Sequence, residues 1–427
     1  MNNYPGASKT DLRNGVKIIT QPMPYVHSVT MGIWVNAGSR DETLAENGLS
    51  HLIEHLIFKG TQKRSAFQIA KEFDDIGGQT NAFTTMENTC FHAKVMDTHL
   101  LTMVDVMSDI FLNSRFDEAE LLKEQPVVLQ EIGMVEDSPD EYIHVLSGKH
   151  FWGDHPLGRS ILGTRENILR FDAETIKHFF QRLYQPDRII ISASGNVDHQ
   201  KFVDLIGPDF ECIRKGSNFP ERQTPAGNTN VNLCARKLEQ THICIGVNGL
   251  STGHPLRYAF SLMSTLLGGN MSSRLFQDIR EKRGLAYTVY SFVSTHVDSG
   301  MFGAYAAVDP ARAAETVQLL VGHMLHLKEH RVKESELKGA KEYIKGNLLL
   351  SSESSENQMV RLAQNEMHFG RQIPLQEVVR KIDAVTADDI QDIAGRLFGN
   401  SKTSLTVLGP IKHKKDFENI LDPLTNS

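Results

Sequence analysis

The second half of this 427-residue chain repeats the first, and this repeat constrains the fold more than any other feature of the sequence. The segment Arg115–Leu121 (RFDEAEL) matches the segment Arg331–Leu337 (RVKESEL) at an offset of 216 residues. The apolar segment 241–247 corresponds to the apolar segment 28–36 at a similar offset. Because recurrence over most of a chain indicates two copies of one structural unit, we expect two homologous domains.

The boundary between the two copies is predicted from composition. Residues 216–228 are polar and contain Pro220, Pro225 and two glycines, which is typical of a linker. We therefore predict a first domain at residues 1–215, a linker at 216–230 and a second domain at 231–427.

Local patterns predict the elements of the first copy. Apolar residues in partial alternation predict strands at 15–20 and 28–36, and helical spacing predicts helices at 48–58, 65–76 and 98–112. The segment 79–95 is rich in Thr, Phe and Val and predicts a strand region. It is either an ordinary part of a sheet or an exposed edge that accepts a peptide as an added strand.

The helix predicted at 48–58 carries two histidines, His51 and His55, four positions apart. Both lie on one helix face, where two imidazoles can occupy two corners of a tetrahedral zinc site. Glu54 lies beside them in the H-x-x-E-H pattern, and a carboxylate there can take a proton from a water that zinc acidifies. The alternative is an amphipathic helix with two surface or core histidines, and a third ligand would distinguish the two.

Two glutamates further along the chain are candidates for that ligand. Glu124 and Glu131 are seven residues apart on a predicted helix, so they share one face. Pro126 lies between them and removes one backbone donor, so we expect a kink there. Taken alone, two glutamates on a helix are also what a solvated helix face carries.

The second copy provides an internal control, because it holds neither the histidines nor the glutamates. The corresponding positions are Phe260–Ser264 for the histidine helix, at an offset near 209, and Ala340 and Asn347 for Glu124 and Glu131, at the offset of 216. If folding required these residues, both copies would carry them. Their restriction to one copy favours a functional site.

Composition excludes several classes of function. Asp and Glu number 52 against 45 Lys and Arg, for a net charge of −7 without a basic run, which disfavours nucleic-acid binding. No apolar run reaches the length of a membrane span, and no signal-peptide pattern is visible. The four cysteines are scattered without C-x-x-C, so a disulfide framework is not expected. These features together favour a cytoplasmic protein.

Several motifs together resemble those of the M16 metallopeptidases, the pitrilysin or inverzincin group. They are His51–His55 followed by Phe58–Thr61 (FKGT), Gly77–Thr84 (GGQTNAFT), Leu129–Glu131 (LQE), Ser272–Phe276 (SSRLF) and Gly284–Tyr287 (GLAY). The resemblance extends over nearly the whole chain and is strongest to the short, two-domain, processing-peptidase-like members. It implies an α+β fold with two homologous domains, each a mainly antiparallel sheet covered by helices.

The resemblance also implies the roles of individual residues. The family places its third zinc ligand about 76 residues after the second histidine, and Glu131 lies 76 residues after His55. The implied roles are zinc ligands for His51, His55 and Glu131, general base for Glu54, orientation of a ligand histidine for Glu124, substrate-pairing edge strand for Asn81 and Ala82, and substrate contact near the scissile carbonyl for Arg280 and Tyr287.

The function implied is that of a zinc metalloendopeptidase with one Zn²⁺ per chain, acting on extended peptides or unstructured segments. In this family four such domains enclose a chamber, so a two-domain chain is expected to form a homodimer. Arg280 and Tyr287 would then serve the zinc of the partner chain. The alternatives are a heterodimer with a related chain and a non-catalytic peptide-binding or assembly subunit of the same fold.

Overall fold

The computed structural model describes residues 6–216, 219, 221–399, 401–411, 414–417 and 419–425. The chain divides into two compact units, each assembled from three separate stretches. Unit 1 consists of Met1–Gly133, Ser160–Arg222 and Leu350–Gln372, and unit 2 consists of Met134–Arg159, Gln223–Leu349 and Ile373–Ser427. Residues 217, 218 and 220 of the linker expected at 216–230 lie outside the described residues, and the continuous boundaries proposed above stay a prediction.

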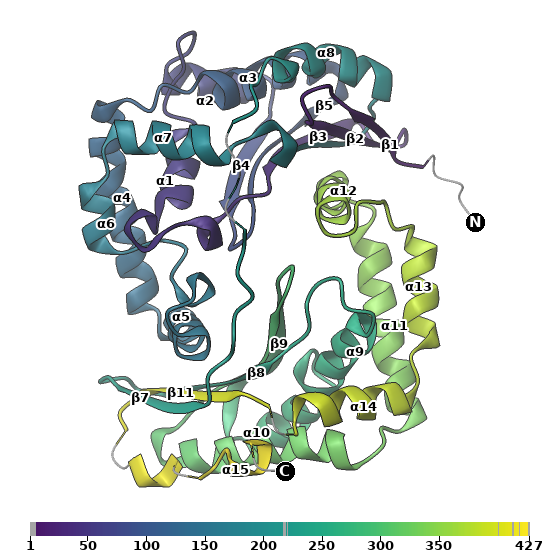
Figure 1. The fold of residues 1–427 in the computed structure, drawn as a ribbon. Coiled ribbons are helices and arrows are strands. Elements are labelled where there is room, and N and C mark those ends of the chain that lie inside the picture. Colours follow the sequence, from purple (N-terminus) through teal and green to yellow (C-terminus); the bar gives the residue numbers. More distant parts are fainter. Residues whose placement is uncertain are drawn as a thin grey trace. The chain divides into compact units, whose positions relative to one another are not determined.

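Unit 1 is built on a six-stranded sheet with the order β1-β2-β6-β3-β5-β4 (Figure 1). The strands are β1 (Ser8–Asp11), β2 (Lys17–Pro22), β3 (Ser28–Val35), β4 (Gln79–Thr84), β5 (Thr89–Met96) and β6 (Ile189–Gly195). Neighbouring strands are antiparallel except for the parallel pair β2 and β6. The strand region expected at 79–95 is therefore a hairpin, and its first strand, β4, forms one edge of the sheet.

Helices cover both faces of this sheet. They are α1 (Leu49–Leu56), α2 (Ala66–Asp74), α3 (Leu100–Asn113), α4 (Glu118–Asp137), α6 (Arg165–Arg170), α7 (Ala173–Leu183), α8 (His199–Glu211) and α12 (Ser355–Phe369). Helices α3 and α8 pack on one face, while α12 packs on β2, β3 and β6 from the other (Figure 1). Ser65, Asp172 and Asp198 cap α2, α7 and α8 by accepting a backbone N–H of the first turn.

Unit 2 has a five-stranded sheet with the order β7-β11-β8-β10-β9. Its strands are β7 (Asn230–Ala235), β8 (Thr241–Asn248), β9 (Ala286–Thr295), β10 (Gly300–Val308) and β11 (Thr403–Gly409). As in unit 1, a single parallel pair, β7 and β11, begins an otherwise antiparallel order. Strand order and direction therefore match β2-β6-β3-β5-β4, which confirms the two homologous α+β domains that the repeat predicts.

The helices of unit 2 repeat those of unit 1. They are α5 (Pro139–Trp152), α9 (Arg257–Gly268), a π-helix (Phe276–Lys282), α10 (Ala313–Glu329), α11 (Glu334–Ser351), α13 (Leu375–Ala384), α14 (Ala387–Leu397) and α15 (Asp422–Thr425). The first residues of α4 and α11, Glu118 and Glu334, are 216 positions apart, as are the first residues of α5 and α12. The offset read from the sequence is thus also the offset between corresponding helices.

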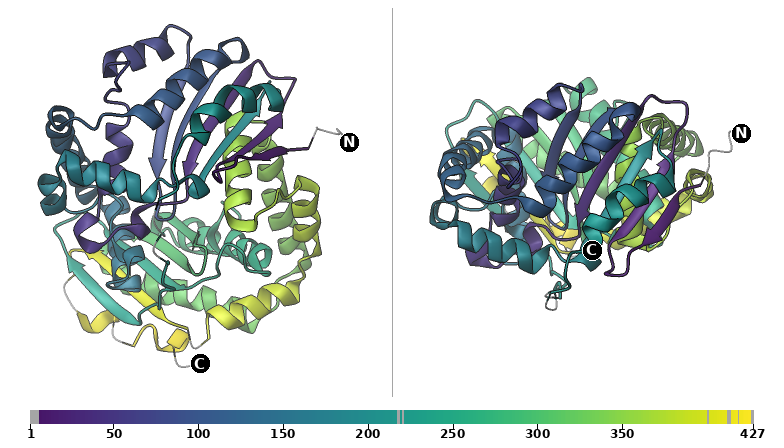
Figure 2. Two further views of the ribbon diagram at one scale, coloured as in Figure 1. Left: turned by 45° about the horizontal axis from the view of Figure 1, so that its top comes forward. Right: turned by 90° about the horizontal axis from the view of Figure 1, so that it is seen from above.

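Each sheet receives one covering helix from the other half of the chain. Helix α12 follows the strands of unit 2 in sequence, yet Met359 and Leu362 pack against Trp34 and Ile190 of the first sheet. The yellow-green helix can be followed across those strands in Figure 2. Helix α5 does the reverse, since Ile143 packs with buried residues of β8, β10 and β11. Both units therefore depend on chain segments that are distant in sequence.

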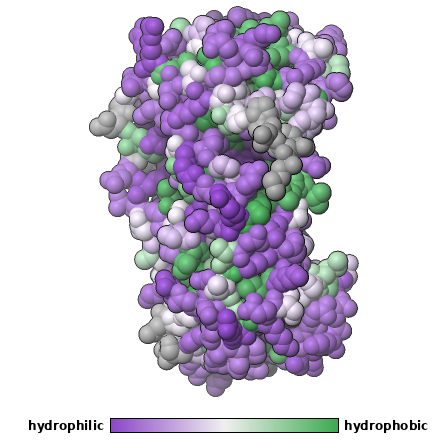
Figure 3. All heavy atoms as spheres, turned by 90° about the vertical axis from the view of Figure 1, so that its right-hand side faces the viewer, coloured by the Kyte–Doolittle hydropathy of each residue, from purple (hydrophilic) through white to green (hydrophobic). Residues whose placement is uncertain are grey.

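Polar side chains on the surface agree with this core. Figure 3 shows one side of the chain, where hydrophilic side chains predominate and apolar ones form small separate patches. Within the described ranges, no helix has both the length and the apolar character needed to cross a bilayer.

Helix α12 is held on unit 1 by a buried ion-pair cluster. The Glu366 carboxylate is almost fully buried and accepts hydrogen bonds from Lys9 Nζ at 2.7 Å and Lys17 Nζ at 2.8 Å. Burial acts to raise the pKa of Glu366, but hydrogen bonds from Lys17 and Lys9 outweigh it and lower the pKa below its ordinary value. The charged form is therefore the one that the folded protein stabilises.

We predict that Glu366→Gln lowers the free energy of unfolding by about 2 kcal/mol at neutral pH, because hydrogen bonds to charged groups contribute roughly 1.5–3 kcal/mol. Since folding lowers the pKa of Glu366, its stabilisation is present above the ordinary glutamate pKa and is lost as the pH falls through the folded-state pKa. Urea denaturation at neutral and acid pH measures the gap between variant and wild type, which should close in acid. Glu356→Gln, at an exposed carboxylate of the same helix, is the control, and a gap that persists in acid contradicts the assignment.

Candidate metal centre

Helix α1 brings the two histidines together on one face. Leu49, Leu52, Ile53 and Leu56 form its buried side, so its orientation is fixed by the core of unit 1. Gly48 precedes it with a φ of 109°, and a Cβ at that position would lie 2.9 Å from Ile168 Cδ1. This tight, left-handed start turns the chain into the helix.

Glu131 completes a group of three ligand atoms. Its Oε2 lies 3.5 Å from His51 Nε2 and 3.4 Å from His55 Nε2. The two imidazole rings are in edge contact, with centroids 4.7 Å apart. Within the described part of the chain, this is the one group of three or more His, Cys, Asp or Glu whose ligand atoms all lie within 4.8 Å of one another. The structure thus brings together the three residues expected as ligands.

Helix α4 supplies both glutamates. It runs from Glu118 to Asp137 without interruption at Pro126, so the proline does not end the helix that carries them. Glu124 Oε2 lies 3.2 Å from His55 Nδ1, and Glu124 Oε1 lies 2.7 Å from Lys59 Nζ. An imidazole that donates Nδ1–H to Glu124 keeps the lone pair of Nε2 for a metal. The contact expected between Glu124 and a histidine is therefore present.

The donor set fits a zinc ion. Three electron-pair donors face one another at 3.4–3.5 Å, and Glu131 Oε2 is buried without a hydrogen-bond partner. Ligands at about 2.0–2.2 Å from zinc are separated by about 3.3–3.6 Å along a tetrahedron edge. Two imidazoles and a carboxylate are also the ligands of known catalytic zinc sites, which keep a fourth position open. A cation would satisfy all three donors at once.

Burial sets the protonation states of the site. Burial and the neighbouring His55 lower the pKa of His51 to about 4, so His51 is neutral, the form that binds a metal, at physiological pH. Burial raises the pKa of Glu54, against the opposing effect of hydrogen bonding to Thr84. Glu54 Oε2 is a buried atom without a hydrogen-bond partner. A carboxylate with a raised pKa next to the three donors is a suitable proton acceptor.

Asn81 and Ala82 lie on β4, the edge strand that packs beside α1. Strand β4 pairs with β5 on one side, and no other strand of unit 1 pairs with its second side. The backbone of an edge strand can accept an extended peptide as one more strand. Asn81 Oδ1 already accepts the N–H of Ala82 at 2.8 Å.

Arg280 and Tyr287 belong to unit 2 and are not part of this cluster. Arg280 lies on the π-helix Phe276–Lys282, a rare type of turn that is frequent at functional sites. Its guanidinium lies 4.7 Å from the centre of the Tyr287 ring and 4.6 Å from that of Phe276. Tyr287 is 76% exposed. The pair expected to contact substrate is thus assembled as a stacked unit.

Two residues that sequence reasoning missed also support the centre. Lys59 pairs with Glu124, and Glu42 accepts backbone N–H groups at the start of α1. Lys59 lies four residues after His55, so helical spacing alone could have placed it near the site. Glu42 gives no comparable signal, because it lies in a loop before the helix.

Comparison with known proteins identifies the family. Residues 17–165 match the family described as Insulinase (Peptidase family M16), and residues 170–344 match Peptidase M16 inactive domain. An uncharacterised zinc protease of Streptomyces coelicolor is 38% identical over 415 residues, which are 95% of this chain and 90% of that protein. This chain belongs to peptidase family M16.

Other M16-like proteins extend the comparison. The uncharacterised zinc protease YmxG of Bacillus subtilis is 40% identical over 386 residues, covering 90% of this chain and 94% of that protein. A protease from Helicobacter pylori shares the fold, with a TM-score of 0.89 at 22% identity over 95% of this chain and all of that one. The M16 zinc proteases therefore include close relatives of this chain.

We predict that Glu124→Gln weakens zinc binding by roughly 10–100-fold, as is typical when a partner of a ligand histidine is lost. The amide no longer attracts the Nδ1 proton of His55, so the ligand nitrogen is less basic and less well oriented. Competition with a fluorescent chelator measures the affinity. Glu120→Gln on the same helix, where Glu120 pairs with Lys123, is the matched control and should bind zinc as the wild type does.

Proposed function

We propose that this M16 protein is a zinc metalloendopeptidase that cleaves extended peptides or unstructured segments. The observation that carries the proposal is the convergence of His51, His55 and Glu131 beside Glu54. Zinc held by the three ligands would polarise a scissile carbonyl and lower the pKa of a bound water. The zinc in the names of the M16 relatives supports this choice of metal.

The residues of the chain have separate tasks in this reaction. Glu54 takes a proton from the attacking water and delivers it to the leaving amine. Strand β4 holds the peptide backbone as an added strand, through the edge that includes Asn81 and Ala82. Arg280 and Tyr287 donate hydrogen bonds to the carbonyl oxygen as negative charge develops on it.

A homodimer is the second part of the proposal. We infer that Arg280 and Tyr287 serve the metal centre of a partner copy, because the chain carries both a complete ligand set and a complete arginine–tyrosine pair. The Arg280 guanidinium supports this role, since its nearest carboxylate in the described chain is that of Glu281, at 3.7 Å. A held but weakly paired guanidinium is suited to bind a substrate oxygen.

Glu54→Gln should retain zinc and lose peptide cleavage by about 10²–10⁴-fold, because the amide cannot accept the proton of the attacking water. Zinc content by elemental analysis, together with cleavage of an unstructured peptide library, measures both properties. Retained cleavage would exclude Glu54 as the base. Zinc binding without cleavage by the wild type, on any peptide tested, would favour the non-catalytic subunit.

Mixing Arg280→Ala with Glu54→Gln tests the dimer. In a mixed dimer with the trans arrangement, one of the two centres has both an intact Glu54 and an intact Arg280. We expect such dimers to recover roughly half the wild-type activity, since the two centres of a symmetric dimer are equivalent. Two affinity tags isolate the mixed dimer for the assay. No recovery in a verified mixed dimer contradicts the trans arrangement.

A further inference from the structure

Three consecutive charged residues, Arg40, Asp41 and Glu42, lie before the metal-binding helix and have no role in the proposed reaction. Arg40 and Glu42 are 4% and 3% exposed, and the Asp41 carboxylate is also buried. Charged residues are almost never buried to this extent unless they are paired. Each of the three binds a different structural element, which suggests a common purpose for the segment.

Glu42 binds the start of helix α1. One carboxylate oxygen accepts the N–H of Ser50 at 2.7 Å, and the other accepts the N–H of Gly48 at 2.9 Å and an amide proton of Asn47 at 3.1 Å. The first N–H groups of a helix have no partner within the helix, so Glu42 supplies what the helix lacks. His51 follows Ser50 directly and belongs to this first turn.

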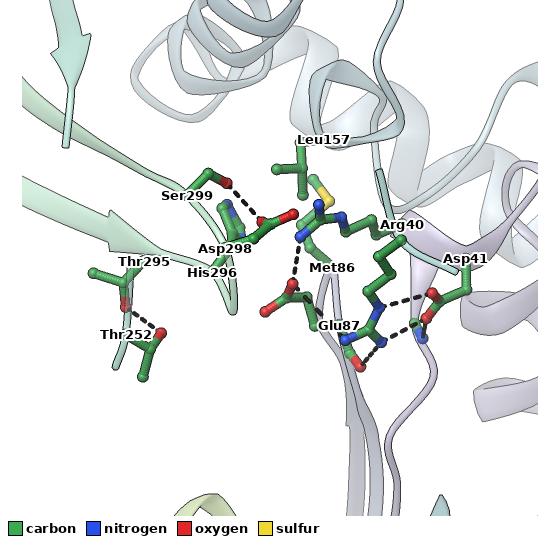
Figure 4. Close-up of polar contacts among 12 residues, drawn as sticks. Arg40, Asp41, Met86, Glu87, Leu157, Thr252, Thr295, His296, Asp298 and Ser299 are labelled. Carbon is green, nitrogen blue, oxygen red and sulfur yellow. Dashed lines mark hydrogen bonds and ion pairs between the residues drawn. The ribbon is translucent and has the colours of Figure 1, made fainter. Parts of the chain in front are cut away.

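Arg40 binds the turn between β4 and β5. Its guanidinium pairs with Glu87 at 2.6 Å, and the two side chains point toward each other in Figure 4. The backbone N–H of Arg40 also donates to the carbonyl of Met86 at 2.7 Å. The segment that precedes α1 is therefore bound to the hairpin that contains the edge strand β4.

Asp41 binds the end of unit 1. Arg222, its last residue, donates two hydrogen bonds to the Asp41 carboxylate, at 2.8 and 2.7 Å, and one to the carbonyl of Glu87 at 2.8 Å. Two parallel bonds between a guanidinium and a carboxylate fix the orientation of both groups. Asp41 is thereby immobilised on the residue next to Glu42.

We propose that Glu42 is a positioning residue for the metal centre, held in place by the Arg40–Glu87 and Asp41–Arg222 ion pairs. Helix α1 has only two turns, and its first turn carries the ligand His51. Without Glu42 this turn loses the acceptors of two N–H groups and frays, which moves His51 away from His55 and Glu131. The inference rests on the zinc site of the proposed function and adds a determinant outside the ligand set.

Glu42→Gln is the sharpest test, because it keeps the size of the side chain and replaces one accepting oxygen by an NH₂ group. Either Gly48 or Ser50 then loses its acceptor. We expect zinc release to a chelator to be faster by about tenfold, at the lower end of the effect of groups that support metal ligands. We also expect a changed visible spectrum of the Co²⁺-substituted protein, since the d–d bands of Co²⁺ report the geometry of its ligands.

Glu46→Gln is the matched control. Glu46 lies in the same segment, but its carboxylate binds the N–H of Thr43 and the side chain of Arg182. Zinc release and the Co²⁺ spectrum should equal those of the wild type. A purely structural role of Glu42 would lower the unfolding temperature and leave the Co²⁺ spectrum of the folded variant unchanged, and that result overturns the proposal.

Arg222→Lys gives a second, milder test if Glu42→Gln does not fold. Lysine cannot make the two parallel bonds to Asp41, so zinc release should be faster, by a smaller factor than in Glu42→Gln. Wild-type release and an unchanged Co²⁺ spectrum in Arg222→Lys contradict the proposed support. Failure of the wild type to bind zinc would remove the proposed function together with this inference, whereas tight wild-type binding with an unaltered Glu42→Gln removes the inference alone.

Discussion

The close approach of two imidazole nitrogens and one carboxylate oxygen is the constraint on which the rest of unit 1 depends. Three electron-pair donors at 3.4–3.5 Å, one of them buried without a hydrogen-bond partner, are unfavourable unless a cation lies among them. The chain maintains this arrangement by rigid means, because His51 and His55 are fixed by the buried side of α1 and Glu131 by the long helix α4. Lys59 and Glu124 then fix the ring of His55.

The sequence was sufficient to predict the repeat, the fold class and the ligand set as a group in space. These depend on local patterns: helical spacing places His51 and His55 on one face, and the offset of 216 predicts that α4 and α11 are equivalent. The exchange of α5 and α12 between the sheets was not predictable in this way. An amphipathic helix shows that it covers a sheet, but its sequence does not indicate which of two similar sheets it covers.

Contacts between charged residues were the second limit. Lys59, Glu42 and Arg222 have the composition of surface positions, yet their side chains reach buried or half-buried partners. Such pairs require knowledge of which loops approach each other, and no periodicity contains that information. The same limit applies to Pro126, whose expected kink suggested an interruption, whereas α4 continues through it with Glu124 in contact with His55.

Comparison of the two units separates what folds the protein from what equips it. Position 260 of α9, equivalent to His51, carries a phenylalanine that is 1% exposed, and position 340 of α11, equivalent to Glu124, carries a buried alanine. The second copy thus fills the same places with apolar side chains that contribute to its core. In unit 1 these places hold polar groups whose burial is costly without a partner. The ligand set therefore costs the apo form stability that a bound metal restores, which explains why one copy retains these groups and the other has replaced them.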